Sequence, residues 1–156
     1  MFLTFTPSKK IKMETRIDIQ KREPAAYHAM LGLEKYLSTS KVDPIILELI
    51  KMRASQINGC AYCLNMHAID ARKLGETEQR LYVLNAWRET TLFSKKEEAV
   101  LALTEEVTLI SNHVLDETYS NAKNLFDEHE LAQIIMAIVT INAWNRIAIT
   151  SKMMVG

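Results

Sequence analysis

Glycine and proline are scarce in this chain, and that scarcity limits its fold more than any other feature. The 156 residues include four glycines and three prolines, and no segment alternates apolar and polar residues for long enough to be a β-strand. Apolar residues recur instead at helical spacing, as in Ala26, Met30, Leu33 and Leu37. We therefore predict a compact all-α protein of about six to seven helices joined by short loops.

Capping residues indicate where these helices begin and end. We expect helices to start near Pro24, Asp43, Cys60, Thr77, Ser94, Asp116 and Glu130. The second should stop at Gly59 and the third at Gly75, because glycine is common just after a helix. The fourth should run to about Trp87 and the sixth to Phe126. The last is apolar almost all round, which is typical of a central helix or a subunit interface.

Charge and hydropathy exclude several classes of partner. Basic and acidic residues number 19 each, so there is no basic face for nucleic acid and no polybasic signal for an anionic membrane. The longest uncharged run, Leu131–Asn145, is shorter than the roughly 20 apolar residues of a membrane span. The first residues lack the charged and apolar regions of a secretion signal. We predict a cytoplasmic protein that binds neither nucleic acid nor membrane.

The chain length suits one domain, which we place at residues 24–156. Residues 1–23 would form an N-terminal arm, partly disordered or partly the product of a mis-called start. Met13 is a second candidate start, so we give residues 1–12 no functional weight.

Two cysteines three residues apart are the most informative motif. In a helix that begins near position 60, Cys60, Cys63 and His67 share one face. Cys60 would lie at the helix start, where unpaired N–H groups and the helix dipole favour a thiolate. His67 would lie close enough to Cys63 to accept or return a proton. The spacing predicts a redox-active thiol pair with a histidine as its base.

Other interpretations of these residues stay open at this point. A cysteine or a histidine on an apolar helix face is often only a core residue. A structural zinc site needs four ligands, and the remaining histidines, His28, His113 and His129, are scattered, so we expect no metal. Two cysteines are too few for the disulfide framework of a small secreted protein, which again favours the cytoplasm.

A longer pattern around the thiols resembles a known family. The pattern consists of Glu48, eleven further residues, Cys60-x-x-Cys63, three further residues and His67. It resembles the active-site pattern of the alkylhydroperoxidase D-like (AhpD-like) branch of the carboxymuconolactone decarboxylase family. The flanking segments 49–60 and 142–146 also fit, and the resemblance covers roughly residues 24–150. It implies an AhpD-like helical fold.

The resemblance also implies a mechanism without haem, metal or flavin. Cys63 would attack the hydroperoxide, and Cys60 would resolve the resulting sulfenic acid as a disulfide. Glu48 and His67 would form the proton relay. The family uses an external dithiol as reductant, in some members a lipoylated carrier protein, and its members form homo-oligomers, commonly trimers or hexamers.

Two site residues raise specific questions. Tyr62 stands where the best-studied members have a histidine, and a phenol that titrates near 10 is a poor proton shuttle at neutral pH. It could donate a hydrogen bond or simply pack against a neighbouring helix. Helical periodicity places Glu48 on the solvent side of its helix, and only the family spacing turns it inward. If it is buried, we expect desolvation to raise its pKa towards neutrality.

Alternative functions follow from the same family. A lactone decarboxylase is one, although its chemistry needs no thiol pair. A non-catalytic oligomer that senses redox state through the disulfide is another. Near the C-terminus, we expect Trp144 to fill the core and Arg146 to pair with an acidic residue, rather than to bind a substrate anion.

Overall fold

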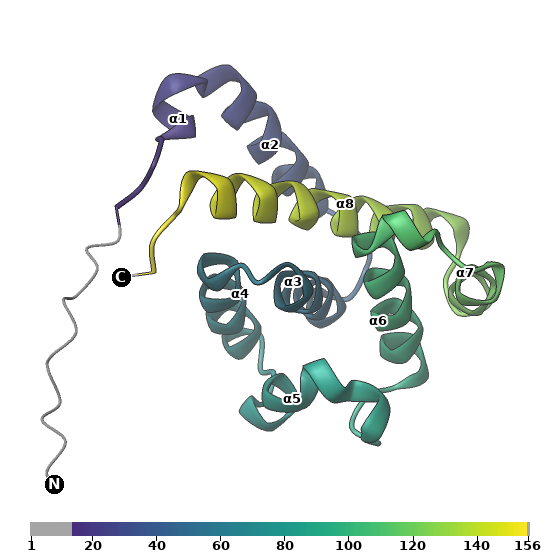
Figure 1. Cartoon of the computed structure of the whole chain (residues 1–156). Coiled ribbons are helices and arrows are strands. Elements are labelled where there is room, and N and C mark those ends of the chain that lie inside the picture. The colour runs from purple at the N-terminus through teal and green to yellow at the C-terminus, as the bar shows by residue number, and fades with distance from the viewer. Residues whose placement is uncertain (1–13, 156) are drawn as a thin grey trace, which may run out of the picture.

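The chain folds into a layered set of helices around one central helix (Figure 1). The fold comes from a computed structural model, which describes residues 14–155. These residues form eight α-helices and two short 3-10 helices: α1 (Ile19–Arg22), α2 (Pro24–Leu37), α3 (Pro44–Asn58), α4 (Ala61–Lys73), α5 (Glu78–Val83), η1 (Leu84–Glu89), α6 (Lys95–Thr108), η2 (Ile110–Asn112), α7 (Asp116–Lys123) and α8 (Glu128–Ser151). The all-α prediction is confirmed, and the expected number of helices was too low.

Helix α3 is the centre of the packing. It contacts α4, α6 and α8, and Figure 1 shows α4 and α6 on either side of it with α8 across the top. One apolar cluster joins Ile50 and Ala54 of α3 to α8 residues such as Ile138. A second cluster joins Leu49 and Met52 of the same helix to α4, α5, η1 and α6. Because α3 contributes to both clusters, it has apolar neighbours on more than one side.

Several predicted helix ends are confirmed. Asp43 caps α3 by accepting a hydrogen bond from the Ile45 N–H, and Gly59 ends that helix with a φ of 70°. The Ser94 side chain and Glu97 form a capping box at the start of α6.

Two predicted helices differ from the structure. The helix from Thr77 is α-helical only to Val83 and continues as the 3-10 helix η1, with a kink at Ala86. Asp116 does not cap α7; it is the first residue of that helix, which ends at Lys123 rather than Phe126. Position 115, a leucine, is the N-cap and offers no side-chain hydrogen bond.

Helix α8 is long and apolar enough to cross a membrane by length and composition, yet it is a core helix here. Half of its most apolar window, with a mean hydropathy of 1.3, is buried inside the protein. It starts two residues earlier than predicted, at Glu128, after a capping box formed by Asp127 and Glu130. Its buried face supplies Ile134, Ile138 and Ile141 to the core beside α3. The protein core therefore accounts for the buried half of this apolar stretch, whereas Val139 and Ile149 of the same helix are exposed.

The N-terminal residues that the structure describes pack against the end of α8. The Arg16 N–H donates a 2.8 Å hydrogen bond to the Ser151 carbonyl oxygen. Asp18 caps α1, and Glu23 joins α1 directly to α2. Residues 1–13, including the second candidate start, lie outside the described residues. The boundary between arm and domain stays a prediction.

Candidate active site

The turn between α3 and α4 positions both cysteines. Gly59 adopts the left-handed conformation that lets the chain reverse, and the Cys60 N–H donates to the Ser55 carbonyl oxygen at 3.0 Å. Cys60 then serves as the N-cap of α4, where its sulfur accepts a 3.3 Å hydrogen bond from the Cys63 N–H. The sulfur of Cys60 therefore lies at the positive end of the helix dipole, as the sequence predicted.

The two cysteines form a disulfide, with 2.14 Å between the sulfurs and 5.4 Å between the Cα atoms. Both side chains are buried, Cys60 at 1% and Cys63 at 2% exposure. Cys63 lines a cavity beside α4, whereas Cys60 is not among the described residues that line it. Of the two sulfurs, Cys63 is therefore the one next to a space that a small molecule could fill.

Glu48 and His67 meet in the protein interior. Oε2 of Glu48 lies 2.9 Å from Nδ1 of His67, and the two residues are 7% and 5% exposed. The periodicity-based position of Glu48 on the solvent side is therefore wrong, and the inward position implied by the family spacing is correct. The carboxylate is buried because its helix, α3, is covered by both apolar clusters.

The pKa of Glu48 is lowered, contrary to the expectation from burial alone. Burial raises the pKa of this carboxyl, but the hydrogen bond from His67 and the charge of Lys51 outweigh it. Lys51 Nζ lies 3.0 Å from Glu48 Oε1, one turn along α3. Glu48 is therefore an anion at neutral pH and accepts a hydrogen bond from the Nδ1–H of His67. Nε2 of His67 is left free to accept or give a proton.

Sequence reasoning missed Lys51 and its second partner. Its ammonium also lies 3.8 Å from Glu34 of α2, so one cation links two helices and two carboxylates. The side chain of Lys51 is only 13% exposed. The i, i+3 spacing from Glu48 was the available signal, since such residues are neighbours on a helix surface.

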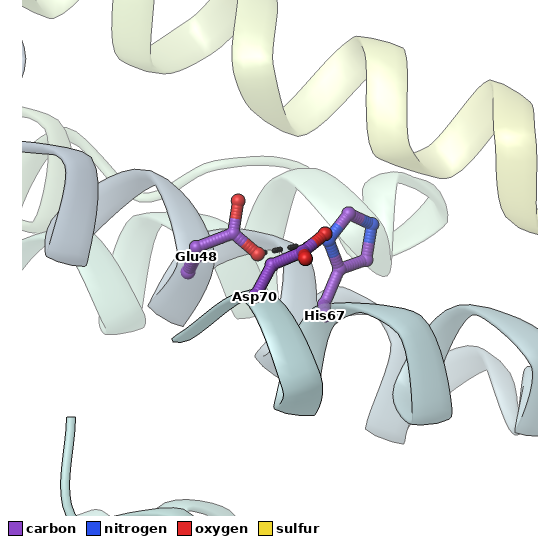
Figure 2. A group of neighbouring side chains, drawn as sticks. All are labelled: Glu48, His67 and Asp70. Atoms are coloured by element: carbon purple, nitrogen blue, oxygen red, sulfur yellow. Dashed lines mark hydrogen bonds and ion pairs between the residues drawn. The ribbon is translucent and has the colours of Figure 1, made fainter. Parts of the chain in front are cut away.

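Asp70 completes a group of three residues with metal-ligand atoms, shown in Figure 2. One ligand atom from each of Glu48, His67 and Asp70 lies within 4.8 Å of the others. Each acid already has a cationic partner, because Glu48 contacts Lys51 at 3.0 Å and Asp70 contacts Lys73 at 2.8 Å. We therefore interpret the group as the hydrogen-bonded pair of Glu48 and His67 with Asp70 nearby, rather than as a metal site.

The cavity beside Cys63 has a volume of about 270 Å³ and a largely apolar wall. Its aromatic residues are Tyr27, Tyr62 and Trp144; its other apolar residues are Leu31, Met66, Ile141, Ala148 and Met153; and its polar residues are Glu34, Lys51, His67 and Asp70. Tyr62 also packs against the core, which agrees with its packing alternative. The wall combines an apolar body with a few charged groups, as ligand sites commonly do.

The expectation for Trp144 is confirmed, whereas that for Arg146 is not. Trp144 packs against the core, as predicted, but it also lines the cavity and meets the ring of Tyr27 edge-on at 5.2 Å between centroids. Arg146 donates to the backbone oxygen and the side-chain oxygen of Asn142, and it has no ion pair with an acid within residues 14–155.

A buried amide network supports the turn that carries the cysteines. The side-chain amide of Asn58 donates to the oxygens of Asn142 and Asn145, at 2.9 and 2.8 Å. Asn145, which is fully buried, donates in turn to the Ser55 hydroxyl at 3.0 Å. The network ties the last turn of α3 to α8 next to Gly59. Asparagines inside the most apolar helix of the chain were the sequence signal for it, because buried amides need partners.

Comparison with known proteins agrees with this geometry. A sequence model of the carboxymuconolactone decarboxylase family matches residues 24–106. The uncharacterized protein YdfG of Bacillus subtilis (strain 168) is 44% identical over 138 residues, which span 88% of this chain and 94% of that protein.

Solved structures share the fold. A protein of unknown function from Agrobacterium tumefaciens, for which an antioxidant defence role of the AhpD type has been suggested, is 35% identical with a TM-score of 0.89. The match covers 92% of this chain and 99% of that one. An uncharacterized peroxidase-related protein from Silicibacter sp. TM1040 is 21% identical with a TM-score of 0.76, over 94% of each chain, and indicates the fold alone.

Proposed function

Because this chain belongs to the carboxymuconolactone decarboxylase family as an AhpD-like member, we propose that it is a dithiol peroxidase that reduces organic hydroperoxides. One observation carries the proposal. A buried, vicinal thiol pair lies at a helix start with one sulfur beside a cavity, and the wall of that cavity includes a histidine held by a buried carboxylate.

The first step oxidises Cys63. His67 takes the thiol proton at Nε2, and the Cys63 thiolate attacks one oxygen of the hydroperoxide. The O–O bond breaks, Cys63 becomes a sulfenic acid, and the alkoxide leaves as an alcohol after receiving the proton back from His67. Glu48 holds the imidazole by its Nδ1–H and stabilises the imidazolium that forms between these two transfers.

The second step forms the disulfide. The Cys60 sulfur attacks the sulfenic sulfur of Cys63, water leaves, and the S–S bond forms. The positions of the two cysteines support this step, because their Cα atoms lie 5.4 Å apart, within the usual range for a disulfide. An external dithiol then reduces the disulfide by thiol–disulfide exchange, giving back two thiols and a cyclic or intermolecular disulfide of the reductant. A lipoylated carrier protein is the reductant that we propose.

The decisive experiment uses the fully reduced chain and one equivalent of tert-butyl hydroperoxide. We expect the protein to lose two hydrogens by intact mass and both of its thiols by thiol titration. The chain has only these two cysteines, so the count is unambiguous. With dihydrolipoamide present, peroxide consumption should be catalytic.

Two cysteine variants provide the matched controls. Cys63→Ser should not consume peroxide, and Cys60→Ser should consume one equivalent and stop as a sulfenic acid that a dimedone-type probe traps. A wild type that keeps both thiols after peroxide treatment would refute the proposal. Oxidation without turnover under any dithiol would instead support a redox-sensing oligomer. Assembly as a homo-oligomer and a cytoplasmic location remain predictions that size measurement and cell fractionation can test.

A further inference from the structure

The cavity beside Cys63 holds an unusual excess of negative charge for an apolar site. Glu34 and Asp70 line it, and Glu48 lies behind its wall, bonded to His67 and Lys51. Among the residues that the structure describes, the buried ammonium that faces these groups is that of Lys51. Three carboxylates and one ammonium leave a net charge of −2 while His67 is neutral.

Lys73 reduces this excess only in part. Its ammonium contacts Asp70 at 2.8 Å, but the side chain is 69% exposed, so water and salt screen its charge. Lys51, at 13% exposure, is already shared between Glu34 and Glu48 and has little attraction left for a third anion. A carboxylate that entered the cavity would therefore lose its hydration without gaining a cation.

The rest of the wall favours neutral apolar groups. Leu31, Met66 and Met153 offer aliphatic and thioether surface, and the edge-on pair of Tyr27 and Trp144 provides aromatic surface. Phenyl or branched alkyl groups bury well against such a wall, and each buried apolar group contributes to binding.

From this charge and this lining we propose that the site selects neutral, apolar hydroperoxides and neutral dithiols, and rejects their carboxylate analogues. The selection among hydroperoxides rests on the proposed dithiol peroxidase function. The selection among dithiols rests only on the presence of the Cys60–Cys63 disulfide. Both reactants are subject to the same selection, because Cys63 is the sulfur that the cavity reaches. Glu34 and Asp70 are then specificity-determining residues.

Two pairs of reagents test the selection, each differing only in a carboxylate. The first pair is cumene hydroperoxide with a para-carboxylate and the methyl ester of the same compound. The second is dihydrolipoate and dihydrolipoamide, which carry the same two thiols. Charges several ångströms apart near a protein surface change binding by about tenfold, so we expect each neutral reagent to react about ten times faster. Higher salt should narrow both ratios.

Charge-neutralising variants assign the effect to named residues. Glu34→Gln and Asp70→Asn should each raise the acid-to-neutral rate ratio about threefold, because each removes one repelling charge. The Glu117→Gln variant is the matched control, because Glu117 is exposed on α7, and α7 lies at the opposite end of the molecule from α4 in Figure 1. The acid-to-neutral rate ratio of this variant should equal that of the wild type.

The outcomes separate this proposal from the proposed function. Equal or faster reaction of the two carboxylates, or unchanged ratios in both charge variants, would overturn the selection. If no hydroperoxide reacts, tert-butyl hydroperoxide included, the peroxidase function fails. The dihydrolipoamide-to-dihydrolipoate ratio for reduction of the Cys60–Cys63 disulfide then still decides the selection.

Discussion

Replacing Glu48 with glutamine tests the buried carboxylate at the centre of the proposed relay. Glutamine has nearly the same shape and can still accept the hydrogen bond from His67 Nδ1, which is 2.9 Å long in the wild type. The variant therefore keeps the orientation of the imidazole but removes the negative charge and, with it, the oxygen that accepts from Lys51. A hydrogen bond to a charged group contributes about 1.5–3 kcal/mol, roughly twice a neutral one. Loss of that difference, about 0.75–1.5 kcal/mol, when the imidazolium forms should slow the Cys63 reaction about 4-fold to 13-fold, at tenfold per 1.36 kcal/mol.

The pH dependence distinguishes a positioning carboxylate from a titrating base. The pKa of Glu48 is below its ordinary value of 4.5, because His67 and Lys51 outweigh the effect of burial. The carboxylate is thus charged throughout the neutral range. At every pH above about 5, the variant should react more slowly than the wild type by the same factor. Any break near neutrality in the pH–rate profile of the wild type should remain in the profile of the variant. The charged Glu48 side chain also stabilises the fold, because its pKa is lower in the folded than in the unfolded protein. This stabilisation is fully present above pH 4.5 and is lost as the pH falls through the folded-state pKa.

The assay is stopped-flow mixing of reduced protein with tert-butyl hydroperoxide, followed by quenching and thiol titration from about pH 5 to pH 8, the range in which an imidazole titrates. The control is the Glu117→Gln variant, whose rate should match the wild type. A Glu48→Gln protein that reacts at the wild-type rate at neutral pH would refute the reasoning. Equally, loss of a break near neutrality would show that Glu48 itself titrates there.

Two further predictions concern Lys51, which pairs with this carboxylate, and Asn145 of the buried amide network. The Lys51→Met variant keeps the aliphatic stem but removes a charge that lowers the pKa of Glu48. The acid limb of the pH–rate profile should therefore move to higher pH. An acid limb that does not move would contradict the pairing of Lys51 with Glu48. The Asn145→Ala variant removes a fully buried amide that is hydrogen-bonded to Asn58 and Ser55. Urea unfolding should show that the free energy of unfolding falls by about 2–3 kcal/mol. A fall of less than about 0.5 kcal/mol would contradict the network.

The sequence predicted helix ends better than helix environments. Caps are local, so Asp43, Gly59 and Ser94 act as their residue types suggest. The stretch after Val83 is different, because the buried Trp87 donates from Nε1 to Glu105 of α6, a contact that no local pattern contains. Tertiary contacts of this kind override helix propensity in short segments.

Glu48 shows why periodicity alone misses a site. Hydrophobic period identifies the most apolar face of a helix and assigns the opposite face to solvent. In α3 that opposite face is covered too, since Leu49 and Met52 belong to a second cluster formed with α4, α5, η1 and α6. Burial of the carboxylate therefore depends on the packing of other helices, and the expected rise in its pKa failed for the same reason. The neighbours that bury it also include the cation and the imidazole that keep it charged.

The proposed thiol relay and one side of the cavity wall come from different parts of the chain. The segment that the family model matches, residues 24–106, contains all four residues of the proposed relay: Glu48, Cys60, Cys63 and His67. These residues come from two helices joined by one turn. Four residues of the cavity wall come from α8 and the residues after it, outside that segment: Ile141, Trp144, Ala148 and Met153. A pair of helices can thus keep the same thiol relay while these four residues change, because none of them takes part in the hydrogen bonds of Glu48 and His67. Substitutions at Trp144 should accordingly alter which hydroperoxide reacts fastest and leave the rate with a small one, tert-butyl hydroperoxide, much less affected.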